Sequence, residues 1–213
     1  MSAVAHIKEY KTGKFYLDEF RGDISWNGYE HNVLLRNEGP DADAIPQFTD
    51  VAMATGADDV KDGRGMAIAD FDNDGGLDII INNNPGDNTD ASRALPTLLH
   101  NNVGTRRNWL AVELEGTRSN RDGVGAQVTI ETGREKQLRL VSAGSGFASQ
   151  NSTRLYFGLN DKTRVDVLTV RWPSGVVEKF EAIGAKPIVA GQVVRIREEK
   201  GIEELSLVAK AQP

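Results

Sequence analysis

An internal repeat is the feature that most restricts how this chain can fold. The series Asn32-Val-Leu-Leu-Arg-Asn-Glu-Gly39 returns about 64 residues later within Leu95-Pro-Thr-Leu-Leu-His-Asn-Asn-Val-Gly104. Each copy is a short apolar run closed by Asn and Gly, which is typical of short strands joined by tight turns. We therefore expect an all-β chain with propeller-like blades. A closed propeller has about 4–8 blades, so about two such units form an incomplete one with open sheet edges.

An aspartate-rich loop, Asp70-Phe-Asp-Asn-Asp-Gly-Gly-Leu-Asp78, lies between the two copies. Clustered carboxylates repel one another unless a cation lies among them, and Ca²⁺ prefers six to eight oxygen ligands. Gly75 tolerates the positive φ that a sharp turn inside this loop requires. The sequence therefore predicts a Ca²⁺ site with four carboxylate ligands and one backbone carbonyl: Asp70, Asp72, Asp74, Asp78 and Gly76.

The sequence also allows purely structural roles for the acidic and amide residues, without a bound metal. The aspartate loop could be a solvated acidic turn, and Mg²⁺ fits it less well because Mg²⁺ takes few protein ligands. Asp62 and Asn82–Asn84 are better interpreted as turn residues than as further ligands. The earlier copy of the loop, at 18–27, keeps too few carboxylates to hold a metal.

After Gly104 the sequence changes to a series of short apolar runs. Their alternation and spacing predict strands of a β-sandwich or small barrel. The strands are expected at 109–114, 126–130, 135–141, 154–158, 165–171, 176–180 and 192–197. The predicted organisation is a blade region at 1–105, a second β domain at 106–200, and a tail at 201–213.

Composition restricts the partners more than the fold. The chain has 213 residues, a net charge of −6 and no cysteine, which excludes disulfides and thiolate metal sites. The negative charge argues against nucleic acid as a partner. No apolar run approaches the ~20 residues of a membrane-spanning helix, and the first residues lack the apolar core of a signal peptide.

The aspartate loop and its flanks resemble an FG-GAP/VCBS repeat, in the series Gly65-x-Ala67-x-Ala69-Asp70-x-Asp72-x-Asp74-Gly75-x-Leu77-Asp78. Such repeats form Ca²⁺-holding propeller blades. The resemblance implies the same aspartate ligands, with Gly76 contributing only its main chain.

The second half resembles the ASPIC/UnbV domain. The matching pieces, in order, are Asn108–Leu114, Ser119–Ala126, Ala143–Gln150, Leu155–Leu159 and Val170–Gly175. Taken together, the two matching regions resemble the C-terminal part of cartilage-acidic-protein-like secreted proteins. They imply an extracellular, cell-surface or periplasmic location and a role in Ca²⁺ binding or adhesion. Some ASPIC/UnbV relatives occur in natural-product gene clusters.

A glycine-flanked loop holds a second group of candidate residues, Asn120, Arg121 and Asp122. They could bind a sugar or a partner carboxylate, or form an internal salt bridge that shapes the loop. No catalytic residue is predicted. The three histidines lack metal-binding spacing, and no nucleophile elbow or phosphate loop is present.

These observations predict a non-catalytic, Ca²⁺-stabilised extracellular module for binding, adhesion or assembly. Protein or carbohydrate partners fit it, and open sheet edges favour a homo-oligomer or filament formed by strand pairing. The alternative is an accessory enzyme or carrier in natural-product biosynthesis. That alternative requires a polar pocket in the second domain, near 120–122.

Overall fold

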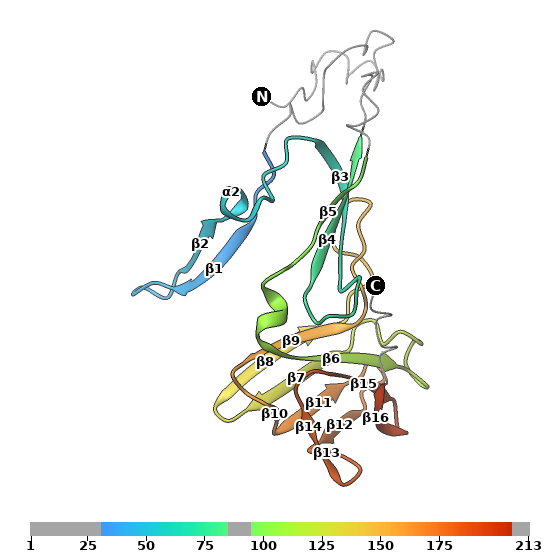
Figure 1. The fold of residues 1–213 in the computed structure, drawn as a ribbon. Helices are drawn as coiled ribbons and strands as arrows, with labels where there is room; N and C mark the ends of the chain where they lie inside the picture. Colours follow the sequence, from blue (N-terminus) through green and yellow to red (C-terminus); the bar gives the residue numbers. More distant parts are fainter. Residues whose placement is uncertain (1–30, 85–94, 206–213) are drawn as a thin grey trace, which may run out of the picture. The chain divides into compact units, whose positions relative to one another are not determined.

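Short strands dominate the structure, a computed structural model that describes residues 31–84 and 95–205 (Figure 1). Within these ranges the helices are one turn of α-helix, α2 (Ala52–Thr55), and one 3₁₀ turn, η2 (Gly104–Arg106). None is long and apolar enough to cross a lipid bilayer. The chain divides into two compact units: unit 1 is 1–66 with 80–99, and unit 2 is 67–79 with 100–213. The predicted all-β class is confirmed.

A two-stranded hairpin makes up the first described part of unit 1. Strand β1 (Leu35–Pro40) pairs antiparallel with β2 (Pro46–Asp50), and a bulge interrupts the register before Gly39. The Asp41 carboxylate closes the turn by accepting hydrogen bonds from the backbone N–H groups of Asp43 and Ile45. Every residue of β2 is exposed, so this hairpin has no buried face.

The aspartate loop connects two strands of a three-stranded sheet. The strand order is β3 (Asp62–Ala69), β4 (Asp78–Asn84) and β5 (Thr97–Leu99). The predicted loop at Asn82–Asn84 is wrong, because these residues complete β4. The Asn83 side chain is buried and donates hydrogen bonds to Leu95 O and Thr97 Oγ1, which satisfies its amide inside the sheet.

Two four-stranded sheets form most of unit 2. The first has the order β16-β15-β6-β9, and the pair β15–β6 is parallel. Its strands are β6 (Asn108–Glu115), β9 (Leu155–Asn160), β15 (Gln192–Arg197) and β16 (Gly201–Leu205). The second has the order β12-β11-β7-β8, with antiparallel pairs throughout. Its strands are β7 (Gln127–Thr132), β8 (Glu135–Leu140), β11 (Val167–Arg171) and β12 (Val177–Phe180).

Three short strands form a further sheet of unit 2 and are labelled in Figure 1. Its order is β10-β14-β13, with β10 (Arg164–Val165), β13 (Ala182–Ile183) and β14 (Lys186–Val189). The predicted strand at 165–171 merges the end of β10 with β11, and β13 and β14 were not predicted. Two or four residues carry too little alternation to stand out from a turn-rich stretch.

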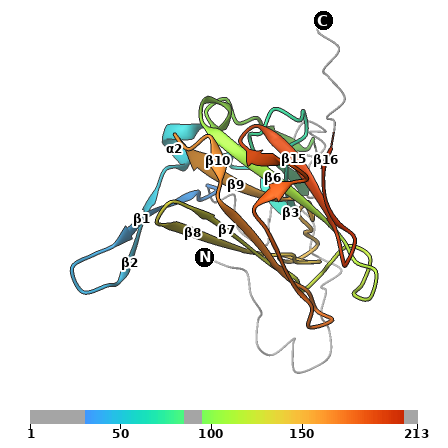
Figure 2. The same ribbon diagram turned by 90° about the horizontal axis from the view of Figure 1, so that it is seen from below.

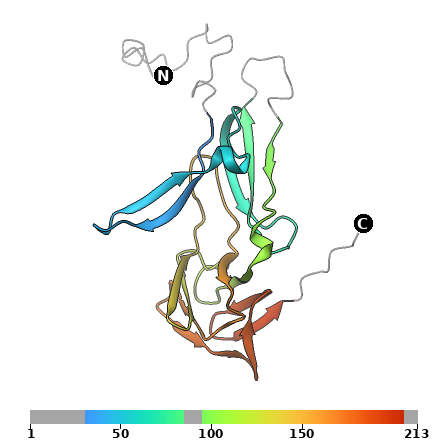
Figure 3. The same cartoon turned by 60° about the vertical axis from the view of Figure 1, so that its left-hand side comes forward.

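The core of unit 2 lies between the two four-stranded sheets (Figures 2 and 3). Alternate residues of β6, β9 and β15 contribute from one side, and those of β7 and β11 from the other. Trp172, predicted as a core residue, is 2% exposed, and its Nε1 donates to Glu178 Oε2. This is the expected sandwich arrangement, with period-2 alternation placing one face of each strand in the core.

The predicted strands of the second half are confirmed in order and to within a few residues. The predicted tail at 201–213 begins with β16, which pairs with β15, and residues 206–213 lie outside the described residues. The predicted degenerate loop at 18–27 also lies outside them.

Candidate metal centre and the adjoining polar pocket

Backbone turns and amide hydrogen bonds give the aspartate loop its shape. Asn73 and Gly75 both have positive φ, at 57° and 90°, so the chain reverses sharply between Asp72 and Gly76. The Asp70 carboxylate accepts hydrogen bonds from the backbone N–H groups of Asp74 and Gly75, at 3.0 and 2.9 Å. The loop therefore folds around its first aspartate, as an Asx-rich turn is expected to do.

The carboxylates converge in two overlapping groups. Ligand atoms of Asp70, Asp72 and Asp78 lie within 4.8 Å of one another, and so do those of Asp72, Asp74 and His100. All four predicted aspartates therefore belong to one cluster, in which Asp72 is common to both groups. Gly76 lies beside them, and its N–H donates to Asp74 Oδ1 at 2.8 Å.

Asp78 is the most buried member of the cluster, with 2% of its surface exposed. Its Oδ2 accepts a hydrogen bond from the Phe71 N–H, and its Oδ1 accepts one from the Asn101 N–H at 2.8 Å. His100 Nδ1 lies 3.0 Å from the same Oδ1. A buried carboxylate needs such partners, and here His100 and Asn101 come from the second copy of the repeat, whereas Phe71 comes from the loop itself.

The donor set fits a hard divalent cation. A carboxylate has about four acceptor positions. Counting the hydrogen bonds above and one from Tyr156 Oη to Asp70 Oδ2, one acceptor position stays open on Asp70 Oδ1 and one on Asp78 Oδ2. Carboxylate oxygens are the ligands that Ca²⁺ prefers. His100 adds an imidazole at one side, a ligand that suits Zn²⁺ better than Ca²⁺. The choice of metal therefore depends on whether His100 takes part.

Three contacts within unit 2 fix the loop against the strands beside it. Gly75 packs on Trp109, whose indole Nε1 would lie 1.9 Å from a Cβ at this position. Tyr156 Oη donates to Asp70 Oδ2 at 3.2 Å, and Arg154 Nη1 donates to the Asn73 side chain at 3.2 Å. The loop is thus a packed part of unit 2 and not a freely solvated turn.

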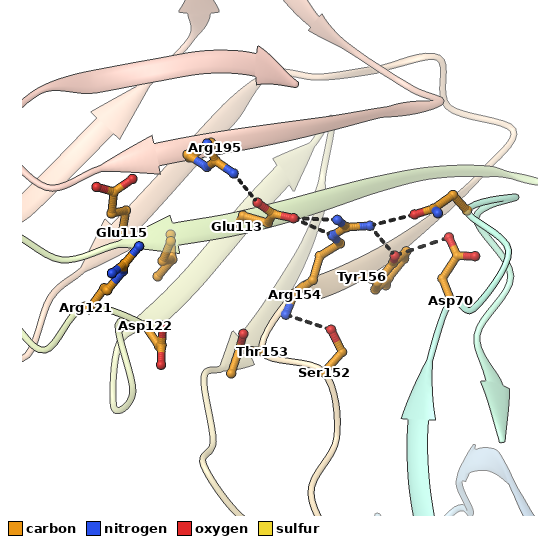
Figure 4. A pocket seen from close by; sticks show the side chains of 12 residues that line it. Asp70, Glu113, Glu115, Arg121, Asp122, Ser152, Thr153, Arg154, Tyr156 and Arg195 are labelled. Atoms are coloured by element: carbon orange, nitrogen blue, oxygen red, sulfur yellow. Dashed lines mark hydrogen bonds and ion pairs between the residues drawn. The ribbon is translucent and has the colours of Figure 1, made fainter. Parts of the chain in front are cut away.

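A polar cavity of about 480 Å³ adjoins the aspartate loop, within unit 2 (Figure 4). It is lined by the loop, by β6, β9 and β15, and by two connecting segments. The residues are Asp70, Asn73, Glu113, Leu114, Glu115, Arg121, Asp122, Ser152, Thr153, Arg154, Tyr156 and Arg195. Its volume lies in the range of small-molecule sites, but its lining is far more polar than usual.

One carboxylate, Glu113, links two guanidinium groups in this cavity (Figure 4). Arg154 Nε and Nη2 both donate to Glu113 Oε1, and Arg195 Nη2 donates to Oε2 at 3.1 Å. Burial lowers the pKa of Arg154, but its hydrogen bonds to Tyr156 and Glu113 raise it more, so the net shift is upward. Burial raises the pKa of Tyr156 to about 12, so its hydroxyl stays a hydrogen-bond donor.

The candidate binding loop is partly structural. The Asn120 side chain donates to Val124 O and accepts from the Val124 N–H, both at 2.8 Å, and so closes the loop on itself. Arg121 and Asp122 line the cavity. The structure does not contain the internal salt bridge that the sequence offered as the structural alternative. Neither Arg121 nor Asp122 makes an ion pair with a described residue. The loop therefore presents two charged groups from a closed turn.

The base of this loop is held by Glu198, which is fully buried. Its Oε2 accepts hydrogen bonds from three consecutive backbone N–H groups, those of Thr117, Arg118 and Ser119, and its Oε1 accepts the hydroxyls of Ser119 and Ser174. Burial by itself raises the pKa of Glu198. The hydrogen bonds from Ser119 and Ser174, with those from Thr117 and Arg118, outweigh it and lower the pKa to about 2.

Sequence reasoning missed several residues of this region. His100 was set aside because the histidines are scattered, although the repeat places it directly after a strand of the blade region. No local pattern marks the roles of Arg154, Tyr156 and Glu198, since their contacts with Glu113, Asp70 and Thr117 join residues tens of positions apart. Asp62, considered as a further ligand, begins β3 and pairs with Arg64.

Comparison with known proteins gives a family match for part of unit 2. Residues 116–203 match the family described as ASPIC and UnbV. The match includes the Glu198 cluster and the loop with Arg121 and Asp122. It does not reach the aspartate loop, for which the FG-GAP/VCBS resemblance stays a prediction.

Two relatives carry the same printed name, cartilage acidic protein 1. The protein of Xenopus tropicalis is 29% identical over 163 residues, which is 76% of this chain and 24% of that protein. The human protein is 33% identical over 115 residues, which is 53% of this chain and 16% of that protein. The matched stretches thus span less than a quarter of these relatives' lengths.

Proposed function

We propose that this chain is a non-catalytic, Ca²⁺-stabilised module for binding, adhesion or assembly outside the cell. An extracellular, cell-surface or periplasmic setting is supported by the similarity to cartilage acidic protein 1, whose name associates it with cartilage. The metal in this proposal has an architectural role. It joins β3 to β4 and holds the loop against Trp109 and Tyr156.

The observation that carries the proposal is the convergence of Asp70, Asp72 and Asp78 within 4.8 Å. Three carboxylates at this spacing repel one another, and the repulsion is largest where Asp78 is withdrawn from water. A Ca²⁺ ion removes that repulsion and uses the acceptor positions that the backbone amides leave open. Asp74 and the Gly76 carbonyl would complete the ligands.

Direct titration tests the metal site. Isothermal calorimetry with Ca²⁺, Mg²⁺ and Zn²⁺ should show saturable Ca²⁺ binding by the parent chain and its loss in Asp72→Ala. Asp161→Ala removes an exposed carboxylate elsewhere and is the matched control. His100→Gln should retain Ca²⁺ binding. If the parent chain binds Zn²⁺ more tightly than Ca²⁺ and His100→Gln loses this preference, the site is a transition-metal site and the Ca²⁺ assignment is wrong.

Self-association forms the second part of the proposal. The hairpin β1–β2 leaves apolar side chains exposed on a two-stranded sheet, which is marginal by itself in water. Val33, Leu35 and Phe48 are each more than half exposed. An open sheet edge with such side chains pairs readily with a strand of another copy, giving a homo-oligomer or filament.

Light scattering at micromolar concentration tests the self-association. We expect a mass above that of one chain for the parent and a monomer for Phe48→Glu. Leu138→Glu, at an exposed position on β8 of unit 2, should leave the mass unchanged. A monomeric parent would contradict this part of the proposal without affecting the metal site.

A second candidate, an accessory enzyme or carrier in natural-product biosynthesis, is supported by the polar cavity beside Arg121 and Asp122. This candidate predicts that a small molecule bound there is changed or handed on, whereas the first predicts binding alone. Mass spectrometry of small molecules before and after incubation with the chain distinguishes the two.

A further inference from the structure

The lining of the polar cavity restricts the chemical class of its ligand. Leu114 is the one apolar residue among the twelve that line the cavity, and all twelve belong to unit 2. Lipids and aromatic ligands gain affinity by burying apolar surface, and the lining of this cavity is mostly polar. A ligand that fits must gain its affinity through hydrogen bonds.

The charges of the cavity argue against a highly charged ligand. Four carboxylates and three guanidinium groups face the same space, and the two signs are interspersed (Figure 4). A phosphate or polycarboxylate would meet the acids Glu113, Glu115 and Asp122 as well as the arginines. A polycation would meet the arginines. A neutral ligand with both donors and acceptors avoids both repulsions.

One wall of the cavity is rigid before any ligand arrives. Arg154 is fixed by Glu113, by the Asn73 side chain and by Tyr156, and Glu113 is fixed in turn by Arg195. A polar group held in place by its neighbours loses little conformational entropy when it binds a ligand. The rigid wall therefore favours a ligand with fixed polar geometry.

The opposite wall carries side chains with unused hydrogen-bonding capacity. Among the described residues, Arg121 and Asp122 make no side-chain hydrogen bond or ion pair, although the backbone around them is fixed. The Gly116 N–H donates to Arg121 O at 2.9 Å, and Asn120 closes the turn. A guanidinium and a carboxylate are thus adjacent on an ordered loop and face the cavity.

We propose that this cavity binds a neutral saccharide, an inference that rests on the proposed role of the chain as a binding module. Each sugar hydroxyl both donates and accepts hydrogen bonds. Pairs of neighbouring hydroxyls match the fork of a guanidinium and the two oxygens of a carboxylate. Arg121 and Asp122 hold such a pair from one side, and the Thr153 hydroxyl and Arg195 also face the ligand (Figure 4).

Saturation-transfer NMR with simple sugars tests the proposal. The probes are the methyl glycosides of glucose, galactose and mannose, with glucuronic acid and inorganic phosphate as anionic comparators. At least one neutral glycoside should receive saturation from the parent chain, and its oligomers should bind more tightly. Arg121→Ala and Asp122→Ala should each weaken that binding about tenfold or more. Arg134→Ala removes an exposed arginine in the β7–β8 turn and should not weaken it.

The outcomes separate this inference from the proposed function. If no neutral glycoside binds, or if only glucuronic acid or phosphate binds, the saccharide inference is wrong. If a glycoside binds equally to Arg121→Ala, Asp122→Ala and the parent, the sugar site lies elsewhere and the assignment to this cavity is wrong. Calcium titration is independent of all these results, so it tests the metal proposal whether or not a sugar binds.

Discussion

The hydroxyl of Tyr156 donates a hydrogen bond of 3.2 Å to Asp70 Oδ2 and accepts one of 3.2 Å from Arg154 Nη1. A residue of β9 in this way links the first carboxylate of the aspartate loop to the polar cavity. Because burial raises the pKa of Tyr156 to about 12, the hydroxyl keeps its proton at every physiological pH. The candidate metal centre and the cavity thus adjoin, since Asp70 belongs to both and Tyr156 holds it.

Tyr156→Phe removes the hydroxyl and leaves the ring in place. We expect a loss of about 1 kcal/mol in the free energy of unfolding, the usual contribution of such a hydrogen bond. Because Asp70 also loses the group that orients it, Ca²⁺ affinity should fall about tenfold. Urea unfolding and calorimetry measure the two effects. An unchanged Ca²⁺ affinity with a normal loss of stability would show that Tyr156 does not orient a metal ligand.

Gly75→Ala should lower the stability of the fold by far more than the backbone strain of a positive φ alone accounts for. The Cβ would lie 1.9 Å from Trp109 Nε1, so the loop or the indole must move, at a cost of about 3 kcal/mol. Gly175 has the same φ of 90° and nothing within 4 Å of an added Cβ. Gly175→Ala should cost about 1 kcal/mol, from backbone strain alone.

Thermal unfolding of the two variants gives the comparison directly. Equal losses in Gly75→Ala and Gly175→Ala would mean that the aspartate loop does not pack on Trp109. In that case the loop is better described as the solvated acidic turn that its sequence also allowed.

The sequence predicted the strands of unit 2 well because their burial alternates with period 2. In β7 and β9 every second residue is buried, and each strand ends near a glycine or asparagine turn. The clustered aspartates were also predictable, since Asp70, Asp72, Asp74 and Asp78 lie within nine residues of one another and local turns bring them together.

The contacts that seat this cluster were not predictable, because they join distant parts of the chain. Asp78 meets Asn101 across 23 residues, and Asp70 meets Tyr156 across 86. No local pattern marks Tyr156 or Arg154 as a partner of the loop. The end of β4 was missed for a related reason. Asn83 looks like a turn residue until Leu95 O and Thr97 supply its hydrogen bonds.

Glu198→Gln should destabilise the loop that carries Arg121 and Asp122. The neutral amide keeps the shape of the side chain, but its single carbonyl oxygen accepts the three backbone N–H groups more weakly than the ionised carboxylate does. We expect a loss of roughly 3 kcal/mol in the free energy of unfolding. Glu199→Gln, at an exposed neighbouring residue, is the control and should cost less than about 0.5 kcal/mol. Similar losses in both variants would contradict the role given to the buried carboxylate.

The lowered pKa of Glu198 predicts that the free energy of unfolding depends on pH. Hydrogen bonds lower the pKa of Glu198 from 4.5 to about 2 in the folded chain, so the ionised form stabilises the fold. That contribution is present above about pH 4.5 and is lost as the pH falls toward 2, because the unfolded chain takes up its proton first. Urea unfolding at about pH 6 and about pH 3 should therefore show a smaller decrease for Glu198→Gln than for the parent. Equal decreases would contradict the lowered pKa.

The central claim is that a Ca²⁺ ion held by Asp70, Asp72, Asp74 and Asp78 stabilises this chain. Thermal unfolding in saturating Ca²⁺ and in excess chelator tests it most directly, with Asp72→Ala and Asp74→Ala as the loop variants. A ligand at about 100 times its dissociation constant adds about 2.7 kcal/mol to the free energy of unfolding, so the parent should melt several degrees higher with Ca²⁺. The variants should lose that increase. A parent that melts at the same temperature in Ca²⁺ and in chelator would contradict the claim.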